Sequence, residues 1–224
     1  MARILVVDDD AALQRALSIA LGSRGNEILA ARAGEQGVVQ AALAQPDVVV
    51  LDLGLPDLPG IEVCRRIRGF SSVPIVVLSA AGDERAKVEA LDSGADDYVT
   101  KPFGMAELEA RLRVALRHRP LAPEDAETVL QVGPLAVDLV HHEVTSDGRD
   151  LELTARESDL LAFLASHAGK VCTHHMILSE VWGPGYQEEA HYLRVYAHRL
   201  RRKLGDAGSL LRTHPGIGYQ LVAD

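Results

Sequence analysis

Apolar runs and helical patterns alternate along the first half of the chain. The strand-like runs lie near 3–7, 27–31, 48–51, 74–78 and 97–99. Between and after them come helical patterns near 10–23, 34–44, 60–69, 84–93 and 104–117. Five such strand–helix units predict an α/β domain with a doubly wound, five-stranded parallel sheet. Right-handed crossovers would place all strand carboxyl ends at one edge, where such sheets bind ligands.

The pattern changes after residue 118. Residues 119–128, RPLAPEDAET, contain two prolines, no aromatic residue and few apolar side chains, which is typical of a flexible linker. From residue 129 to 224 short strand-like pieces come first, followed by helical stretches and a closing hairpin. The helical stretches are 155–167, 174–181 and 187–204. This order predicts an α+β module small enough to be a winged helix-turn-helix. We therefore expect a domain over 1–118, a linker over 119–128 and a second domain over 129–224.

Composition fits a two-domain globular protein. The chain has 224 residues, of which 47% are hydrophobic and 25% charged. No apolar stretch approaches the roughly 18 residues that a membrane span needs, so we expect a cytoplasmic protein that does not contact a membrane. Cys64 and Cys172 lie far apart without metal-ligand spacing, which favours buried free thiols.

Polar side chains follow four of the five predicted strands of the first domain. Asp8 and Asp9 follow the first strand, Asp52 the third, Ser79 the fourth and Lys101 the fifth. Three carboxylates in one crevice would repel one another unless a hard cation such as Mg²⁺ neutralised them. Asp52 could then attack phosphorus, while the lysine and the serine stabilise phosphoryl oxygens. Any one of these residues alone is more often a solvated loop residue or a helix cap.

Several spaced motifs resemble the OmpR/PhoB family of two-component response regulators. They are ILVVDDD, VVVLDLGLPDLPG, PIVVLSA and GADDYVTKPF, together with the basic C-terminal module. The resemblance implies a CheY-like receiver followed by a winged-helix DNA-binding domain. It implies that a sensor histidine kinase is the phosphoryl donor. The roles implied within the receiver are phosphoacceptor for Asp52, Mg²⁺ ligands for Asp8, Asp9, Asp52 and the Gly54 carbonyl, phosphate contacts for Ser79 and Lys101, and switch aromatic for Tyr98.

A Mg²⁺-dependent phosphohydrolase that passes through an aspartyl phosphate is the alternative for this site. Phosphatases of the haloacid dehalogenase type place a second aspartate two residues after the nucleophile, as the acid and base of hydrolysis. Here that position is Gly54, which favours a phosphorylated switch over a hydrolytic enzyme.

The resemblance also implies a symmetric homodimer that forms on phosphorylation. In this family, charged residues of the fourth helix, fifth strand and fifth helix form salt bridges between two receivers. The matching pairs here are Lys87 with Glu107 and Asp97 with Arg111. Asp96 would need a basic partner farther along, at Arg117 or Arg119.

The predicted helix near the C-terminus concentrates positive charge in an acidic domain. Residues 120–224 hold 9 basic and 15 acidic side chains, yet five of the nine basic residues fall within 191–204. A helical wheel puts an apolar stripe on one side, formed by Leu193, Tyr196, Ala197, Leu200 and Leu204. His191, Arg194, Val195, His198 and Arg202 face away from that stripe. The second side could enter a major groove.

The hairpin RTHPGIGYQL matches the wing of this output family. Many members carry arginine where Pro215 stands, so Arg212 or Thr213 would contact phosphates instead. On the helix, Arg194, Arg199 and Arg202 are candidates for base or phosphate contacts, and His198 and Arg201 for the DNA backbone. An output module that binds protein is the alternative, and RNA polymerase is a further candidate partner. Within the family, the motifs LDLGLPD and HYLR resemble regulators of potassium-uptake operons.

Overall fold

The computed structural model describes residues 1–80, 84–116, 129–183, 185–187 and 189–222. The chain divides into two compact units, Met1–Arg117 and His118–Asp224. The expected linker, 119–128, lies outside the described residues.

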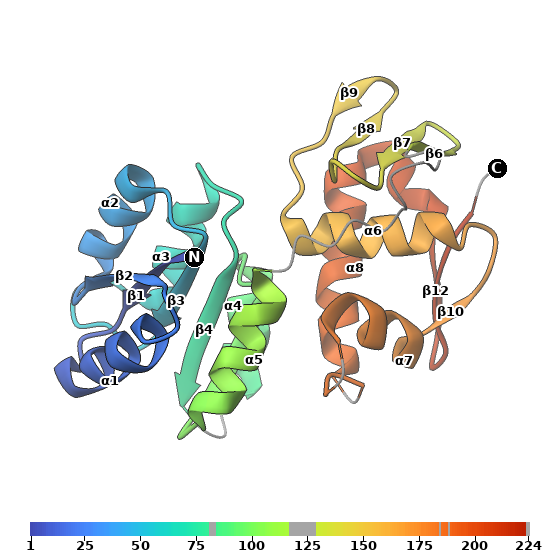
Figure 1. Ribbon diagram of the computed structural model, residues 1–224. Helices are drawn as coiled ribbons and strands as arrows, with labels where there is room; N and C mark the ends of the chain where they lie inside the picture. The colour runs from blue at the N-terminus through green and yellow to red at the C-terminus, as the bar shows by residue number, and fades with distance from the viewer. Residues whose placement is uncertain (81–83, 117–128, 184, 188, 223–224) are drawn as a thin grey trace. The chain divides into compact units, whose positions relative to one another are not determined.

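The first unit is built on a parallel sheet with the strand order β2-β1-β3-β4-β5 (Figure 1). Its strands are β1 (Arg3–Val7), β2 (Glu27–Ala31), β3 (Val48–Asp52), β4 (Ile75–Ala80) and β5 (Asp97–Lys101). Its helices are α1 (Ala11–Gly22), α2 (Gly34–Ala44), α3 (Gly60–Arg68), α4 (Glu84–Asp92) and α5 (Met105–Ala115). The predicted doubly wound sheet is confirmed.

Helices cover both faces of this sheet, which explains why its central strands are almost wholly Val, Ile and Leu. On one face, α1 and α5 pack Leu17, Leu21, Leu108 and Leu112 against strand residues that include Val50. The other face carries α2, α3 and α4, which follow one another in contact. Strands β4 and β5 extend two residues beyond the predicted ends, because their ladder continues to the pairing of Ala80 with Lys101.

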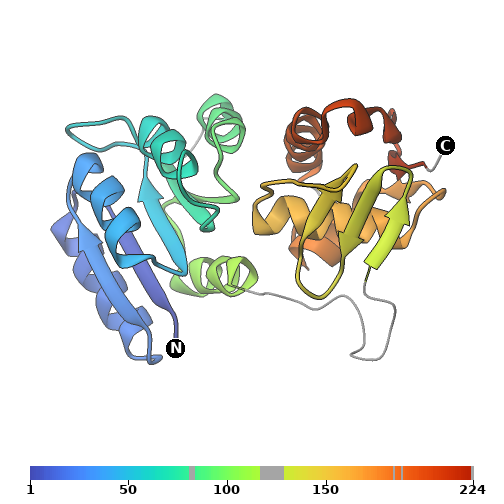
Figure 2. The same ribbon diagram turned by 90° about the horizontal axis from the view of Figure 1, so that it is seen from above.

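The second unit combines a small antiparallel sheet, a group of helices and a three-stranded sheet. The four-stranded sheet contains β6 (Val129–Val132), β7 (Leu135–Asp138), β8 (Val144–Ser146) and β9 (Arg149–Asp150). Figure 2 shows it in yellow against α6 (Ala155–Ser166), which contacts β6 and β7. The remaining elements are β10 (Cys172–Thr173), α7 (His174–Ile177), η1 (Leu178–Trp182), α8 (Ala190–Leu204), η2 (Gly205–Leu210), β11 (Leu211–His214) and β12 (Gly218–Leu221).

Two local features of this unit differ from the sequence-based expectation. The helix expected over 174–181 is a four-residue α-helix followed by a π-helical turn, η1. The closing hairpin gains a third strand, β10, which pairs with β12 and is too short to stand out as a pattern. Gly218 makes that pairing possible, since a Cβ there would lie 1.9 Å from the carbonyl oxygen of Cys172.

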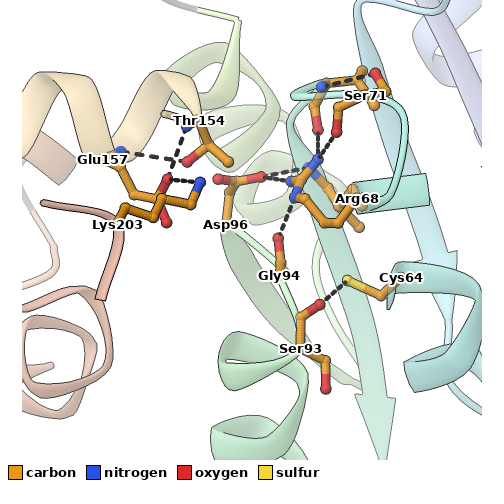
Figure 3. A network of polar contacts seen from close by, with 11 residues as sticks. Cys64, Arg68, Ser71, Ser93, Gly94, Asp96, Thr154, Glu157 and Lys203 are labelled. Atoms are coloured by element: carbon orange, nitrogen blue, oxygen red, sulfur yellow. Dashed lines mark hydrogen bonds and ion pairs between the residues drawn. The ribbon is translucent and has the colours of Figure 1, made fainter. Parts of the chain in front are cut away.

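Helix α6 begins with a capping box. The Thr154 side chain accepts a hydrogen bond from the Glu157 N–H, and the Glu157 carboxylate accepts one from the Thr154 N–H (Figure 3). Lys203 of α8 donates to the same carboxylate at 2.6 Å, so one buried acid joins the start of α6 to the end of α8.

Candidate functional site

The carboxyl ends of β1, β3, β4 and β5 bring the predicted polar residues together. The ammonium of Lys101 donates to Asp8 Oδ2 at 2.9 Å and to Asp52 Oδ1 at 2.7 Å. Asp52 is the last residue of β3, so its strand carries it to the sheet edge and then stops. The parallel register that sets Ala80 of β4 opposite Lys101 brings the lysine to this edge. Residues 93 positions apart in sequence therefore meet in one ion-paired group.

Three carboxylates form the acidic part of this site. Oxygen atoms of Asp8, Asp9 and Asp52 all lie within 4.8 Å of one another. Asp8 is fully buried and Asp52 is 8% exposed, whereas Asp9 is exposed. Backbone N–H groups supply part of the compensation, since Asp10 donates to Asp8 Oδ1 at 2.8 Å and Gly54 to Asp52 Oδ2 at 3.0 Å. Buried carboxylates are costly without such partners.

Lys101 provides the remaining positive charge. Burial favours loss of its proton, but the hydrogen bonds and charges of Asp52 and Asp8 outweigh that effect, so the pKa of Lys101 lies above the ordinary lysine value. The lysine therefore stays charged between the two acids at any physiological pH. It is one cation beside a group of three carboxyl side chains.

The Ser79 hydroxyl is the unpartnered group at this edge. Ser79 is 1% exposed, and its Oγ makes no hydrogen bond to any residue in the described part of the chain. A buried hydroxyl without a partner costs free energy, so its presence points to a ligand that completes it. The oxygen-rich donor set suits Mg²⁺, which prefers few carboxylates, several waters and a phosphate oxygen. The side chains present fit both a divalent cation and a phosphoryl group.

The predicted switch aromatic lies on β5 between two cations. Tyr98 is 5% exposed, and Lys87 Nζ of α4 sits 4.6 Å from the centre of its ring. The guanidinium carbon of Arg111, on α5, lies 6.0 Å from the same centre. Arg111 also donates to Asp97 Oδ1 at 3.0 Å and to Glu107 Oε1 at 3.3 Å. Asp97 and Arg111, expected to pair between two receivers, pair here within one.

Asp96 has a different environment from the one that the sequence suggested. Its carboxylate accepts hydrogen bonds from Arg68, on α3, and from the Ile75 N–H at 2.8 Å (Figure 3). Arg68 also donates to the Gly94 carbonyl at 2.8 Å, so it holds the segment that leads into β5. The role of Arg68 was not predicted from the sequence, because a basic residue in the last turn of a helix is usually solvated or interacts with the helix C-terminus. The suggested partners of Asp96, Arg117 and Arg119, lie outside the described residues.

Helix α8 presents a narrow line of exposed side chains. Arg194, His198 and Arg202 are exposed and follow one another at four-residue intervals on one face. His191 is half-buried and lies 3.3 Å from Glu189. The predicted apolar stripe is confirmed, since all five of its members are buried: Leu193, Tyr196, Ala197, Leu200 and Leu204.

Two residues of α8 depart from the expected face. Val195, expected to face away from the stripe, is 5% exposed, and Arg199 is 4% exposed with its guanidinium 5.0 Å from the Tyr196 ring centre. The large Tyr192 and Tyr196 rings widen the buried arc beyond what aliphatic residues would cover, and the arginine stem extends it. Val195 and Arg199 are therefore not part of the exposed face of α8.

Arg201 joins α8 to β11, the first strand of the C-terminal hairpin. Its guanidinium donates twice to the Leu211 carbonyl, at 3.0 and 2.7 Å, and once to Thr213 Oγ1 at 2.6 Å. Arg212 and Thr213 are both exposed on β11. Arg201, expected on the DNA backbone, therefore uses its Nε and Nη2 donors inside the protein, and these contacts join α8 to β11.

In the described part of the chain, no helix is both long and apolar enough to cross a membrane.

Comparison with known proteins agrees with this geometry. Residues 4–113 match the family described as "Response regulator receiver domain", and residues 148–221 match "Transcriptional regulatory protein, C terminal". The chain is 47% identical to the transcriptional regulatory protein KdpE of Mycobacterium tuberculosis, with all of both chains covered. It is 43% identical to the KDP operon transcriptional regulatory protein KdpE of Escherichia coli, covering 99% of this chain and 100% of that one.

Solved structures lead to the same family. A RitR mutant superposes with a TM-score of 0.77 at 26% identity, and 99% of each chain is covered. The response regulator DrrB of Thermotoga maritima, described as an OmpR/PhoB homologue, gives a TM-score of 0.52 at 29% identity over 99% of each chain. With a receiver fold, an acid–lysine–serine site and a C-terminal regulatory domain, the chain belongs to the OmpR/PhoB family of phosphorylation-activated, DNA-binding response regulators and is of the KdpE type.

Proposed function

We propose that Asp52 accepts a phosphoryl group in a Mg²⁺-dependent reaction from a phosphohistidine of a sensor histidine kinase. The observation that carries the proposal is the group formed by Lys101, Asp8 and Asp52, with the unpartnered Ser79 hydroxyl at the same sheet edge. One carboxylate oxygen of Asp52 forms a bond to phosphorus as the phosphorus–nitrogen bond of the donor breaks. The donor imidazole keeps that electron pair.

The surrounding residues stabilise the product of this transfer. Mg²⁺, held by Asp8, Asp9, Asp52 and the Gly54 carbonyl, would supply positive charge to the phosphoryl oxygens. Lys101 pairs with a phosphoryl oxygen, and the Ser79 hydroxyl donates to another. Gly54 offers no carboxylate to activate water, which favours a phosphorylated switch that persists.

Phosphorylation would then alter the face built from α4, β5 and α5. The added charge of about −1.5 to −2 attracts Ser79, and the Tyr98 ring turns inward into the vacated space. Lys87 and Arg111 lie over that ring, so its rotation removes one contact of each cation, while Arg111 keeps its bonds to Asp97 and Glu107. The homodimer pairs are Lys87 with Glu107 and Asp97 with Arg111, which requires the Asp97–Arg111 pair within the chain to open. A pair formed by an exposed side chain such as Glu107 contributes about 0 to 1 kcal/mol, which suits a reversible dimer. Asp97 and Arg111 are only 6% and 16% exposed, so opening their internal pair opposes the dimer in the unphosphorylated chain.

The output domain binds promoter DNA through α8 and its wing. Arg194, His198 and Arg202 form the exposed face that enters the major groove, and Arg212 contacts a phosphate from the wing. Two output domains in one dimer engage repeated half-sites, and RNA polymerase is the partner that the bound dimer contacts. The KdpE relatives support a potassium-uptake operon as the regulated target.

Intact mass after incubation with acetyl phosphate and Mg²⁺ tests the phosphoacceptor. We expect one phosphoryl adduct in the wild type and in Asp47→Asn, whose aspartate precedes β3 at the opposite edge of the sheet, and none in Asp52→Asn. An undiminished adduct in Asp52→Asn would refute the assignment. Size-exclusion chromatography with light scattering on the same samples tests whether the dimer forms only with the adduct.

Fluorescence anisotropy with a labelled promoter fragment tests the DNA face. The fragment is taken from a potassium-uptake operon, and an unrelated promoter serves for comparison. Arg194→Ala and Arg202→Ala should each weaken binding and reduce the dependence of log K on log salt by about 1. Arg149→Ala, an exposed arginine on β9, is the matched control and should leave both unchanged. No DNA binding by the phosphorylated wild type would favour a protein-interaction module.

A further inference from the structure

The loop that carries Gly54 runs from Leu53 to Pro59, between β3 and α3. Its two ends are fixed by backbone contacts, because the Gly60 N–H donates to the Leu53 carbonyl at 3.1 Å. A Cβ at Gly60 would lie 2.3 Å from the Asp52 carbonyl oxygen, so only glycine allows this close return. The middle of the loop needs a separate anchor.

Asp57 provides that anchor by capping a helix from another part of the chain. Its Oδ1 accepts the Gly34 N–H at 2.7 Å, and its Oδ2 accepts the Glu35 N–H at 3.0 Å. These are the first N–H groups of α2, whose own N-cap residue, Ala33, makes no side-chain cap. The first N–H groups of a helix have no partner within it, so a carboxylate here is well matched to them.

Two further observations support the anchor. The hydrogen bonds from the Glu35 and Gly34 N–H groups lower the pKa of Asp57 below its ordinary value, so the cap stays ionised. The two segments also meet closely, since a Cβ at Gly34 would lie 2.9 Å from Leu58 Cβ and 2.7 Å from Val63 Cγ2. A glycine at the start of α2 thus lets the loop lie directly against the helix.

We infer that Asp57 is a positioning residue for the metal and phosphoryl site. By capping α2 it holds the loop in which the Gly54 N–H donates to Asp52 Oδ2 at 3.0 Å. The same loop carries the Gly54 carbonyl, so the inference rests on the proposed Mg²⁺ site. Asp57 contacts neither the cation nor the phosphoryl group and acts only through the backbone of residues 53–59.

The chain offers a matched control for this role. Asp47 Oδ2 accepts the Arg3 N–H at 2.6 Å, which is the same kind of bond between two elements, but at the opposite end of the sheet. Asp57→Ala and Asp47→Ala each remove a carboxylate that accepts backbone N–H groups. Asp57→Asn keeps an oxygen that can accept one of the two N–H groups, and it serves as the conservative variant.

Two measurements on the full-length chain test the inference. The first is the Mg²⁺ dissociation constant from calorimetric titration with Mg²⁺ alone. We expect Asp57→Ala to raise the Mg²⁺ dissociation constant about tenfold, which is the low end of the loss in affinity caused by mutating residues that position a metal ligand. Asp57→Asn should raise it less, and Asp47→Ala should stay within about twofold of wild type. The second is amide hydrogen exchange of Gly54 without Mg²⁺, which should accelerate in Asp57→Ala and not in Asp47→Ala.

The outcomes separate this inference from the proposed function. Unchanged Gly54 exchange and unchanged Mg²⁺ affinity in Asp57→Ala would overturn the inference and leave the metal site intact. Equal losses in Asp57→Ala and Asp47→Ala would also overturn it, because the effect would then be general destabilisation. Failure of the wild type to bind Mg²⁺ would overturn the metal part of the proposed function and of this inference. Faster Gly54 exchange in Asp57→Ala would still support the anchoring of the loop by Asp57.

Discussion

Lys101 is the point at which the electrostatics of the receiver can be tested most directly. Replacing it by methionine keeps most of the side-chain volume and removes the ammonium group that pairs with both Asp8 and Asp52. Among the described residues, backbone N–H groups then remain as partners of the two acids, and an exposed third acid, Asp9, lies beside them. We expect Lys101→Met to destabilise the receiver without Mg²⁺ and to make its stability depend on the cation.

The size of the effect follows from burial. The side chains of Asp8, Asp52 and Lys101 are 1%, 11% and 31% exposed. Breaking a fully buried pair costs about 3–5 kcal/mol, and exposed pairs contribute about 0–1 kcal/mol. A partly exposed lysine falls between these limits, at about 2 kcal/mol of unfolding free energy for the two contacts together. For a domain of about 100 residues this lowers the Tm by about 8 °C.

Differential scanning calorimetry with EDTA and with Mg²⁺ measures this effect. Tryptophan fluorescence is unsuitable, because Trp182, the single tryptophan, belongs to the second unit. Mg²⁺ at 100 times its dissociation constant stabilises by about 2.7 kcal/mol. It should stabilise Lys101→Met more than the wild type, since the lysine no longer competes for the acids. Lys87→Met, outside the acidic cluster, is the control and should respond to Mg²⁺ like wild type. Equal stabilisation of wild type and Lys101→Met by Mg²⁺ would refute the reasoning.

Three further predictions concern the second unit and the core. Arg201→Ala should weaken DNA binding by anisotropy about tenfold with an unchanged salt dependence, because its Nε and Nη2 donors are occupied by β11 and hold that strand against α8; a salt slope lowered by about 1 would contradict this. NMR titration should place the pKa of His141 above its ordinary value, because the His141 ring is hydrogen-bonded to the Asp138 carboxylate. The charged pair then stabilises the fold at low pH, and this stabilisation is lost as the pH rises through the raised pKa. Asp138→Asn should return the pKa of His141 to the ordinary range. Leu108→Ala, at a fully buried position of α5, should cost about 2–5 kcal/mol in chemical denaturation, and a cost below 1 would contradict close packing there.

The sequence by itself determined the order of elements and the place of the chemistry. Unbroken Val and Leu runs such as 48–51 identify strands covered on both faces, and such strands need a parallel sheet with its ends at one edge. That topology is enough to bring Asp8, Asp52 and Lys101 together, since each of them stands at or just after the carboxyl end of a parallel strand. The apolar stripe of α8 was equally predictable, because helical periodicity is local.

Only the tertiary structure decided which polar groups bond to one another. Asp96 with Arg68, Arg201 with Thr213 and Asp57 with the start of α2 each join residues that no periodic pattern connects. The sequence does not show whether a charged side chain is solvated, caps a helix or forms an ion pair, because its partner depends on how the other elements pack. Periodicity therefore predicts where a residue lies, and the three-dimensional arrangement determines which contacts it makes.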